Sequence, residues 1–237
     1  MKAVIQAGGK GTRLRPYTLV LPKPLVPVGG MPIIEILFQW LKRNGIDESC
    51  ITLGYLGDLI RAVCQDGSQW DLPISYVHEK QPLNTVGALT LIDRSYLDDT
   101  FFCLNGDVLT DLNLRDMAKF HHSHGGLLTV AMYKKPIYVD LGVMDLDSDN
   151  KVLAFREKPT LHFSVSMGVY CMQPEILDII PSKVAFGFDD LMYTMLDKNL
   201  PVHVYQHDGL WMDIGRPEDY LAAQDIFEKN KTSILGC

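Results

Sequence analysis

The sequence has no long apolar run and no surplus of positive charge, and each absence excludes a class of protein. No apolar run reaches the length of about 20 residues that a transmembrane helix needs. The short apolar stretch after Met1 gives way to glycine without the long hydrophobic region and small-residue cleavage site of a signal peptide. The formal net charge of −7 disfavours general binding of DNA or RNA. We therefore expect a cytoplasmic protein that binds neither membrane nor nucleic acid.

The sequence also lacks any C-x-x-C pair among its five cysteines. Because five is an odd number and four of these residues have apolar neighbours, we expect buried free thiols in a reducing compartment. Cys237, the last residue, is expected to be an exposed free thiol. A chain of 237 residues can bury a hydrophobic core without disulfides.

What is present is an alternation of apolar strand patterns and helical patterns. Helices are predicted at 33–41, 58–63 (capped by Asp58), 112–121, 174–180, 189–197 and 217–229, and strands at 3–7, 51–53, 74–77, 101–104, 127–133, 168–172 and 202–205. Two further apolar runs, 142–146 and 152–155, flank a turn-forming D-S-D-N segment and predict a hairpin. The pattern predicts an α/β fold: a Rossmann-like, mixed and mostly parallel sheet flanked by helices, with a small antiparallel portion. Since no linker or repeat is visible, residues 1–237 are expected to form a single domain.

A glycine-rich loop follows the first predicted strand, at residues 8–13 (GGKGTR). In such a turn the backbone amides approach a ligand closely and favour an anion, and the lysine and arginine add positive charge. The loop is not a P-loop, and Leu14 stands where a dinucleotide fingerprint needs its third glycine. Shortly afterwards, Lys23 lies between Pro22 and Pro24, which restrict the backbone on both sides. This combination indicates a phosphate-binding site.

The segment from Ala7 to Pro27, AGGKGTRLRPYTLVLPKPLVP, resembles the signature of the sugar-1-phosphate nucleotidyltransferases, a family that includes mannose-1-phosphate guanylyltransferases. The joint G-x-G-T-R-L-x-P and P-K-P patterns carry the resemblance. It implies transfer of a nucleoside monophosphate from an NTP, with GTP favoured, to a hexose or heptose 1-phosphate, with release of pyrophosphate. The resemblance runs from Met1 to about Phe227. Nothing after Lys229 resembles a β-helical or acyltransferase domain, so the catalytic core alone is expected.

The resemblance implies a magnesium site made by two aspartates. Asp107 follows an apolar strand pattern, and Asp213 lies in W-M-D-I-G-R-P, which resembles the family's W-x-D-I-G-x-P. Two carboxylates suffice because Mg²⁺ prefers oxygen ligands and keeps several waters. Arg13 is expected to neutralise the leaving pyrophosphate, and Lys23 and Lys158 to hold the two phosphates in line. No catalytic histidine is expected, because the attacking phosphate is already ionised.

The resemblance also implies the residues that contact each substrate. For the sugar they are Asn105, Gly142, Glu157, Lys158 and Ser166, of which 157 and 158 belong to an E-K-P motif. For the nucleotide they are Gln6, Ala7, Gly8, Gly9, Lys10, Gly11, Thr12, Arg13, Gly54, Thr85 and Gly87. The chain departs from the common family pattern at Gln6, Asn84, Val86, Leu141 and Ser166. The base and the sugar are therefore left open.

Two other functions compete with this interpretation. One is a cytidylyl-, uridylyl- or thymidylyltransferase that acts on another sugar phosphate or on a phosphocholine-like acceptor, although the E-K-P motif disfavours phosphocholine. The other is a non-catalytic regulatory subunit that binds sugar nucleotides. Such a subunit would be expected to lose Arg13, Lys23 or a metal aspartate, all of which this chain keeps. Family members are often dimers or larger, and the sequence leaves a homo-oligomer open.

Overall fold

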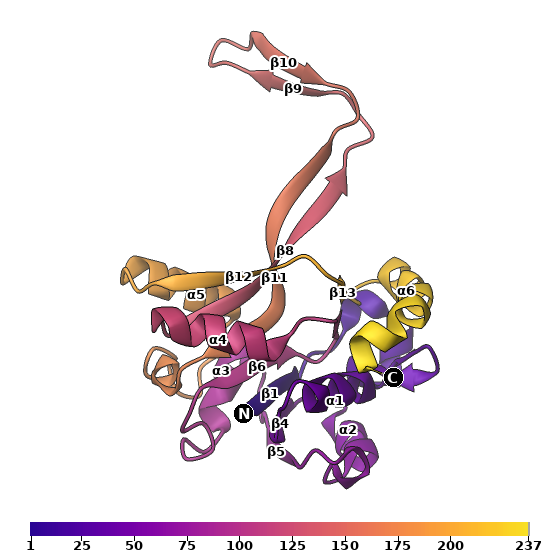
Figure 1. The fold of residues 1–237 in the computed structure, drawn as a ribbon, viewed down its shortest axis with the longest axis vertical. Helices are drawn as coiled ribbons and strands as arrows, with labels where there is room; N and C mark the ends of the chain where they lie inside the picture. The colour runs from indigo at the N-terminus through magenta and orange to yellow at the C-terminus, as the bar shows by residue number, and fades with distance from the viewer. Residues whose placement is uncertain (237) are drawn as a thin grey trace.

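The computed structural model describes residues 1–236 and has a seven-stranded sheet at its centre (Figure 1). In spatial order the strands are β12 (Val202–His207), β8 (Leu128–Tyr138), β11 (Thr160–Met172), β6 (Phe101–Asn105), β1 (Lys2–Ala7), β4 (Glu48–Leu53) and β5 (Ile74–His78). Strand β11 runs antiparallel to β6 and β8, and the other neighbouring strands are parallel. The sheet is mixed and mostly parallel, which confirms the predicted class.

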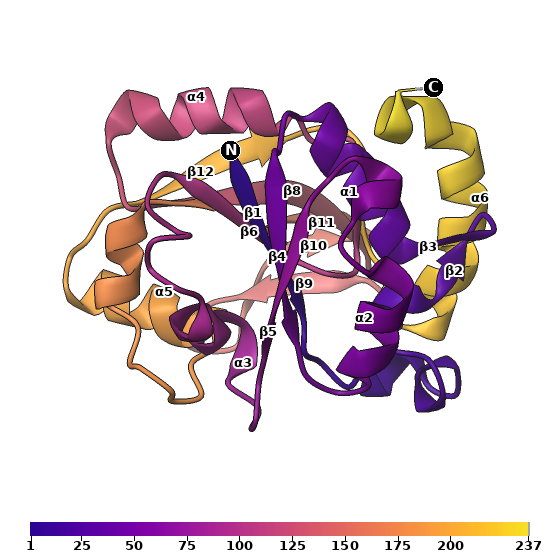
Figure 2. The ribbon, with the colours of Figure 1, turned by 90° about the horizontal axis from the view of Figure 1, so that it is seen from below.

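Helices cover both faces of this sheet (Figure 2). Side chains alternate along each strand, so that Ala3 and Ile5 pack into one hydrophobic core and Val4 into the other. The first core includes side chains of α1 (Ile33–Arg43), α2 (Gly57–Cys64), α4 (Leu114–His124) and α6 (Pro217–Leu235), and the second includes those of α3 (Asn84–Gly87) and α5 (Phe188–Asp197). A parallel sheet needs such cover on both faces.

Helix α1 shows why the predicted helices form. Its buried positions recur at helical spacing, for example at Ile33, Leu37 and Leu41, and they pack into the first core. The helix ends at Asn44, which is followed by Gly45 with a φ of +79°. Glycine at this position favours the left-handed backbone that commonly terminates a helix. The sequence predicted this helix and its end.

Other predicted boundaries differ from the structure. Asp58 lies inside α2 rather than at its cap, because Leu56 precedes the helix in a left-handed conformation. The helix predicted for 174–180 is a short 3-10 helix, and α6 continues to Leu235. The remaining short elements are 3-10 helices at Thr12–Leu14, Tyr17–Leu19, Lys23–Leu25, Ser68–Trp70, Ala88–Leu91 and Pro174–Asp178, and the strand pair β2 (Pro27–Val28) and β3 (Met31–Pro32).

A pair of short strands joins two segments that are far apart in the sequence. Strand β7 (Val108–Thr110) pairs antiparallel with β13 (Trp211–Asp213), and Asp213 lies opposite Val108. The indole nitrogen of Trp211 donates a hydrogen bond to the carbonyl of Met167 at 2.9 Å. This pairing brings residue 213 beside residue 107, next to the end of β6.

Strands β8 and β11 continue far beyond the sheet and form an arm, which we define as residues 133–166 (Figure 1). They pair from Tyr133 opposite Val165 to Tyr138 opposite Thr160. The tip of the arm is a hairpin of β9 (Val143–Leu146) and β10 (Val152–Arg156), which confirms the predicted hairpin. The inner parts of these two strands were predicted at 127–133 and 168–172, whereas their extensions at 134–138 and 160–167 were not.

The four described cysteines, Cys50, Cys64, Cys103 and Cys171, are free and buried, as expected. Cys237 lies outside the described residues. Within residues 1–236, no helix is both long enough and apolar enough to cross a membrane.

Candidate active site

A hollow lies at the carboxyl ends of β1, β4, β5 and β6. In an open α/β sheet these ends form the usual ligand-binding edge. The hollow has a volume of about 690 Å³. Its lining consists of Gln6, Gly8, Gly9, Lys10, Thr52, Gly54, Tyr55, Glu79, Lys80, Gln81, Pro82, Asn84, Thr85, Asn105, Asp107, Gly187 and Asp189.

A second hollow of about 240 Å³ adjoins the first and shares Gln6, Gly9 and Asp107 with it. Its other lining residues are Ala7, Gly11, Thr12, Arg13, Lys23, Pro24, Gly106 and Gly215. The glycine loop therefore lies between a wide pocket and a narrower one, which is lined by Arg13, Lys23 and Asp107. All predicted nucleotide-binding residues line one hollow or the other, with the exception of Gly87.

The glycine loop is held by close backbone contacts. A Cβ on Gly54 would lie 2.6 Å from the carbonyl oxygen of Gly8, and the Tyr55 amide donates to that same oxygen at 3.2 Å. Gly9, by contrast, has no heavy atom within 4 Å of the position that a Cβ would take. Gly54 is therefore required for packing, whereas Gly9 leaves open space in which a ligand can approach the backbone.

Two carboxylates and a buried lysine meet between the hollows. The ammonium of Lys23 donates to Oδ2 of Asp107 and lies 3.7 Å from Oδ1 of Asp213. Lys23 is 9% exposed. Burial and the neighbouring charge of Asp107 raise the pKa of Asp213, against the opposing effect of Lys23 and Arg13. The cluster therefore already accommodates a positive charge between two acidic groups.

Arg13 lies on the same side of the cluster. The position of a Cβ on Gly215 would be 3.2 Å from Oδ2 of Asp213 and 3.6 Å from Nη1 of Arg13. Four of the five predicted catalytic residues are thus brought together, from three distant parts of the sequence.

The residues present fit a magnesium ion. Oδ1 of Asp107 is buried and has no hydrogen-bond partner, so one hard oxygen is free to act as a ligand. Within the described chain no group of three or more His, Cys, Asp or Glu side chains could hold a metal. A two-carboxylate site therefore depends on substrate phosphates and water for its remaining ligands, as is usual for Mg²⁺.

Gln6 and Thr85 meet in the wide pocket. Nε2 of Gln6 donates to the carbonyl of Thr85, and Oε1 of Gln6 is buried without a partner. The hydroxyl of Thr85 accepts the backbone N–H of Phe188 at 2.9 Å, which joins this wall to the start of α5. Gln6 therefore has one unsatisfied acceptor, while its amide nitrogen donates to the Thr85 carbonyl and to Sγ of Cys103.

Glu79 is a pocket residue that the sequence analysis missed. Its Oε2 accepts the Leu83 amide at 2.8 Å, and burial raises the pKa of its carboxyl. A Cβ on Gly8 would lie 2.2 Å from its Oε1, so the side chain lies against the glycine loop. The available signal was its position just beyond the predicted strand at 74–77, since ligand-binding residues often follow the carboxyl ends of such strands.

Gly87, predicted to contact the nucleotide, packs closely against a neighbouring loop, and its contact with the nucleotide stays a prediction. A Cβ there would lie 2.5 Å from the carbonyl oxygen of Val184, and the residue lines neither hollow. The nearby Asn84 has a φ of +59°, the left-handed conformation that asparagine tolerates better than most residues.

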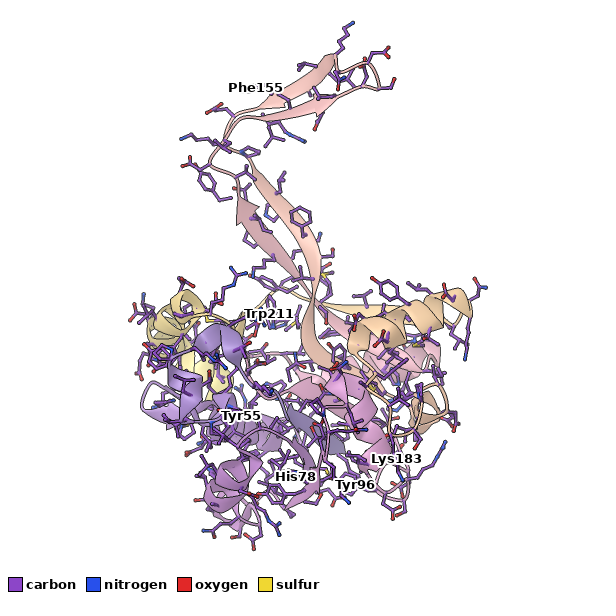
Figure 3. All side chains as sticks on the ribbon, turned by 180° about the vertical axis from the view of Figure 1, so that it is seen from behind. Tyr55, His78, Tyr96, Phe155, Lys183 and Trp211 are labelled. Carbon is purple, nitrogen blue, oxygen red and sulfur yellow. The ribbon has the colours of Figure 1, made fainter. Side chains whose placement is uncertain are left out.

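The structure separates the predicted sugar-binding residues. Asn105 lines the wide pocket, and Ser166 lies at the root of the arm, where its hydroxyl accepts the Gly168 amide at 3.3 Å. Gly142, Glu157 and Lys158 lie near the tip of the arm. Figure 3 shows Phe155 of the tip far from Tyr55 of the wide pocket. These three residues line neither hollow, because continued pairing of β8 with β11 carries them away from the sheet, and their contact with the sugar stays a prediction.

Comparison with known proteins agrees with this geometry. The Nucleotidyl transferase family matches residues 2–230. The UTP–glucose-1-phosphate uridylyltransferase of Synechocystis sp. is 34% identical over 241 residues, covering 94% of this chain and 62% of the relative. Mannose-1-phosphate guanylyltransferase 1 of Arabidopsis thaliana is 33% identical over 235 residues, covering 96% and 64%. The chain thus spans somewhat less than two thirds of the length of these relatives.

Among solved structures, HddC from Yersinia pseudotuberculosis has a TM-score of 0.75 and 25% identity, with coverage of 95% of this chain and 99% of that one. Its complex with GMP-PN has a TM-score of 0.72. The matched family, these relatives and the motifs around the two hollows agree, and the chain belongs to the nucleotidyl transferase family, among the sugar-1-phosphate nucleotidyltransferases.

Proposed function

We propose that the protein transfers a nucleoside monophosphate from GTP to a hexose or heptose 1-phosphate and releases pyrophosphate. The observation that carries this proposal is the meeting of Arg13, Lys23, Asp107 and Asp213 beside a pocket of about 690 Å³. Such a pocket has the size of a small-molecule site. The names of the relatives support the reaction class, and they include both guanylyl- and uridylyltransferases.

In this reaction an oxygen of the sugar phosphate attacks the α-phosphorus of the NTP. A new P–O bond forms while the bond from the α-phosphorus to the bridging oxygen breaks, and that electron pair leaves with pyrophosphate. Since the attacking oxygen is already ionised, no proton transfer is needed. The chain must therefore position two anions and stabilise the charge that collects on the α-phosphate oxygens. We call the part of the structure outside the arm the body. Lys23 and Arg13 are the cations of the body that line the narrow hollow.

Asp107 and Asp213 would hold the magnesium ion. The ion would supply charge stabilisation and reduce the repulsion between the two phosphates. Lys23 contacts both carboxylates and holds them in place through its positive charge. Gly9 and Gly11 allow the phosphates to approach the backbone of the loop.

Glu79 supports GTP as the nucleotide. A carboxylate only accepts hydrogen bonds, and guanine presents two adjacent donors, N1–H and N2–H, on one edge. Uracil and thymine present one N–H between two carbonyl oxygens, and a carboxylate repels these oxygens. The amide of Leu83 already binds Oε2 and fixes the orientation of the side chain. The GMP-PN complex of HddC, a structure 25% identical to this chain, also supports a guanine nucleotide.

Pyrophosphate release with magnesium tests the proposal. GTP, UTP, CTP and dTTP are each combined with mannose, glucose, N-acetylhexosamine and heptose 1-phosphates. We expect release with GTP and one sugar phosphate, lost with EDTA. Release with another NTP would contradict the choice of base but support the class. If no pair releases pyrophosphate although the protein binds NTP, the acceptor is a different one. If the protein neither releases pyrophosphate nor binds NTP, the result favours the regulatory subunit.

A further inference from the structure

The arm exposes large apolar side chains that nothing in its own chain covers. Leu141 is 72% exposed, Leu153 65% and Phe155 59%. Two-stranded hairpins are marginally stable in water unless a third strand or a helix packs on them. An exposed apolar surface of this kind marks an interaction site. The arm therefore offers an apolar surface for a partner to cover.

The body carries a second exposed apolar surface beside the narrow hollow. We call it the lip and define it as Tyr17, Leu19, Val20 and Leu21, which lie between the glycine loop and Lys23. Val20 is 75% exposed and Leu19 53%. The hydroxyl of Tyr55, a lining residue of the wide pocket, donates to the carbonyl of Leu19 at 3.3 Å. The lip therefore borders the mouth of the site.

The arm also carries charged groups that lie outside the two hollows. Lys158 has a φ of +43°, and its ammonium lies 2.7 Å from Oδ1 of Asp140 on the surface. Glu157 lies beside Gly142, where a Cβ would be 3.3 Å from its Oε2 and 2.6 Å from the ring of Phe155. One cation, one carboxylate and an aromatic ring are thus grouped near the tip. This grouping suits a phosphate and the hydroxyls of a sugar, and no residue of the arm lines either hollow of its own chain within the described residues.

We propose that two copies of this chain exchange arms, so that the arm of each copy covers the lip and the mouth of the other copy's site. Every copy has one arm and one lip. In a dimer with a two-fold axis each arm covers the other copy's lip, so that no arm and no lip stays uncovered. Lys158 and Glu157 of one copy then complete the acceptor side of the other copy's site. The identity of that acceptor as a sugar phosphate rests on the proposed function, whereas the exchange itself rests only on the two apolar surfaces.

The first test is the assembly state of the full chain, measured by sedimentation velocity. We expect two chains for the wild type and one chain for the double variant Leu153→Ser, Phe155→Ser. The matched control is Leu59→Ser, Val63→Ser, which removes two apolar side chains that are 40% and 44% exposed on α2, a helix of the body. The control should remain a dimer. A wild type that sediments as one chain would overturn the proposal.

The second test asks whether the arm acts in its own chain or in its partner. Asp107→Ala and Lys158→Ala are co-expressed with different tags, and the mixed species is purified through both tags. Each variant alone should be inactive. In an arm-exchanged dimer, one of the two sites combines an intact body with an intact arm, so about half of the wild-type activity should return.

The outcomes separate this inference from the proposed function. An inactive mixed species beside an active wild type would show that the arm serves its own chain, and would overturn the exchange. A wild type that releases no pyrophosphate from any pair would refute the proposed function only, and the sedimentation result would then decide the exchange alone.

Discussion

Lys23 shows how a single buried side chain organises the site at the scale of residues. An ammonium group is buried only where opposite charges compensate its desolvation. Here Asp107 and Asp213 provide that compensation, and Lys23 in turn limits their mutual repulsion. The three side chains therefore depend on one another, and each should be sensitive to substitution.

Asp107→Asn should lower kcat/KM for pyrophosphate release by about 10²- to 10³-fold, the effect of removing one charged group that stabilises a transition state. The amide keeps the shape of the carboxylate but loses its charge. Asp208→Asn is the control, because Asp208 lies on the surface and accepts a hydrogen bond only from Gln206. A kcat/KM of Asp107→Asn close to that of the control would show that Asp107 takes no part in the mechanism.

Glu79→Gln should lower kcat/KM for GTP by about 10- to 100-fold and narrow the preference for GTP over UTP. Leaving a guanine donor without its acceptor costs about 1–3 kcal/mol. The amide offers one acceptor and one donor, which suits uracil better than the carboxylate does. Competition between GTP and UTP measures the change, with the exposed, remote Glu175→Gln as control. An unchanged ratio would show that Glu79 does not read the base.

At the scale of elements, the loop after β1 and the loop after β4 form one unit. Gly54→Ala places a methyl group against the backbone of Gly8, which cannot yield as a flexible side chain can. We expect a loss of about 1–3 kcal/mol in the free energy of unfolding, as for other overpacked sites. Urea denaturation measures this loss.

Gly9→Ala is the matched variant for the same measurement. Its methyl group enters open space, so the free energy of unfolding should stay at the wild-type value while KM for GTP rises. If both variants were equally stable, the close contact between the two loops would not be a source of stability.

The sequence pattern did not predict the long strands of the arm. The segment 134–136, K-K-P, interrupts the apolar alternation that marks a strand, and residues 162–164 are exposed. Strands that pair only with each other, with both faces open, need no alternation of buried and exposed side chains. The hairpin at the tip was predicted because its turn chemistry is local.

At the scale of the whole molecule, His121 links stability to pH. It is fully buried on α4, with Nδ1 2.8 Å from the hydroxyl of Thr129 and Nε2 3.0 Å from the amide nitrogen of Gln173. Burial, reinforced by His122, His124 and His203, lowers its pKa from 6.5 to about 4.

The folded chain therefore stays unprotonated at His121 while the unfolded chain takes up a proton near pH 6.5. The stability that this group contributes is present above pH 6.5 and is lost as the pH falls towards about 4, by up to about 3 kcal/mol. Urea denaturation at several pH values measures the slope. His121→Gln should flatten it, whereas the exposed His162→Gln should not. Equal slopes for the wild type and His121→Gln would contradict this account.

The sequence by itself determined the elements and the chemistry whose signals are local. Alternating patterns identified the strands and helices outside the arm, and glycines and prolines identified the phosphate loop. The resemblance to the family, together with the position after an apolar strand, identified Asp107. The roles of the predicted residues in binding and catalysis remain predictions for the experiments above.

The resemblance implied that Asp107 and Asp213 share a metal site, and only the tertiary structure shows the contacts that bring them together. The pairing of β7 with β13 sets Asp213 beside Asp107, and burial in the pocket distinguishes Glu79 from other acidic residues after strands. The continued pairing of β8 with β11 carries Lys158 away from its own site. These outcomes depend on contacts between segments far apart in the chain, and a local pattern contains no information on the partner with which a strand end pairs.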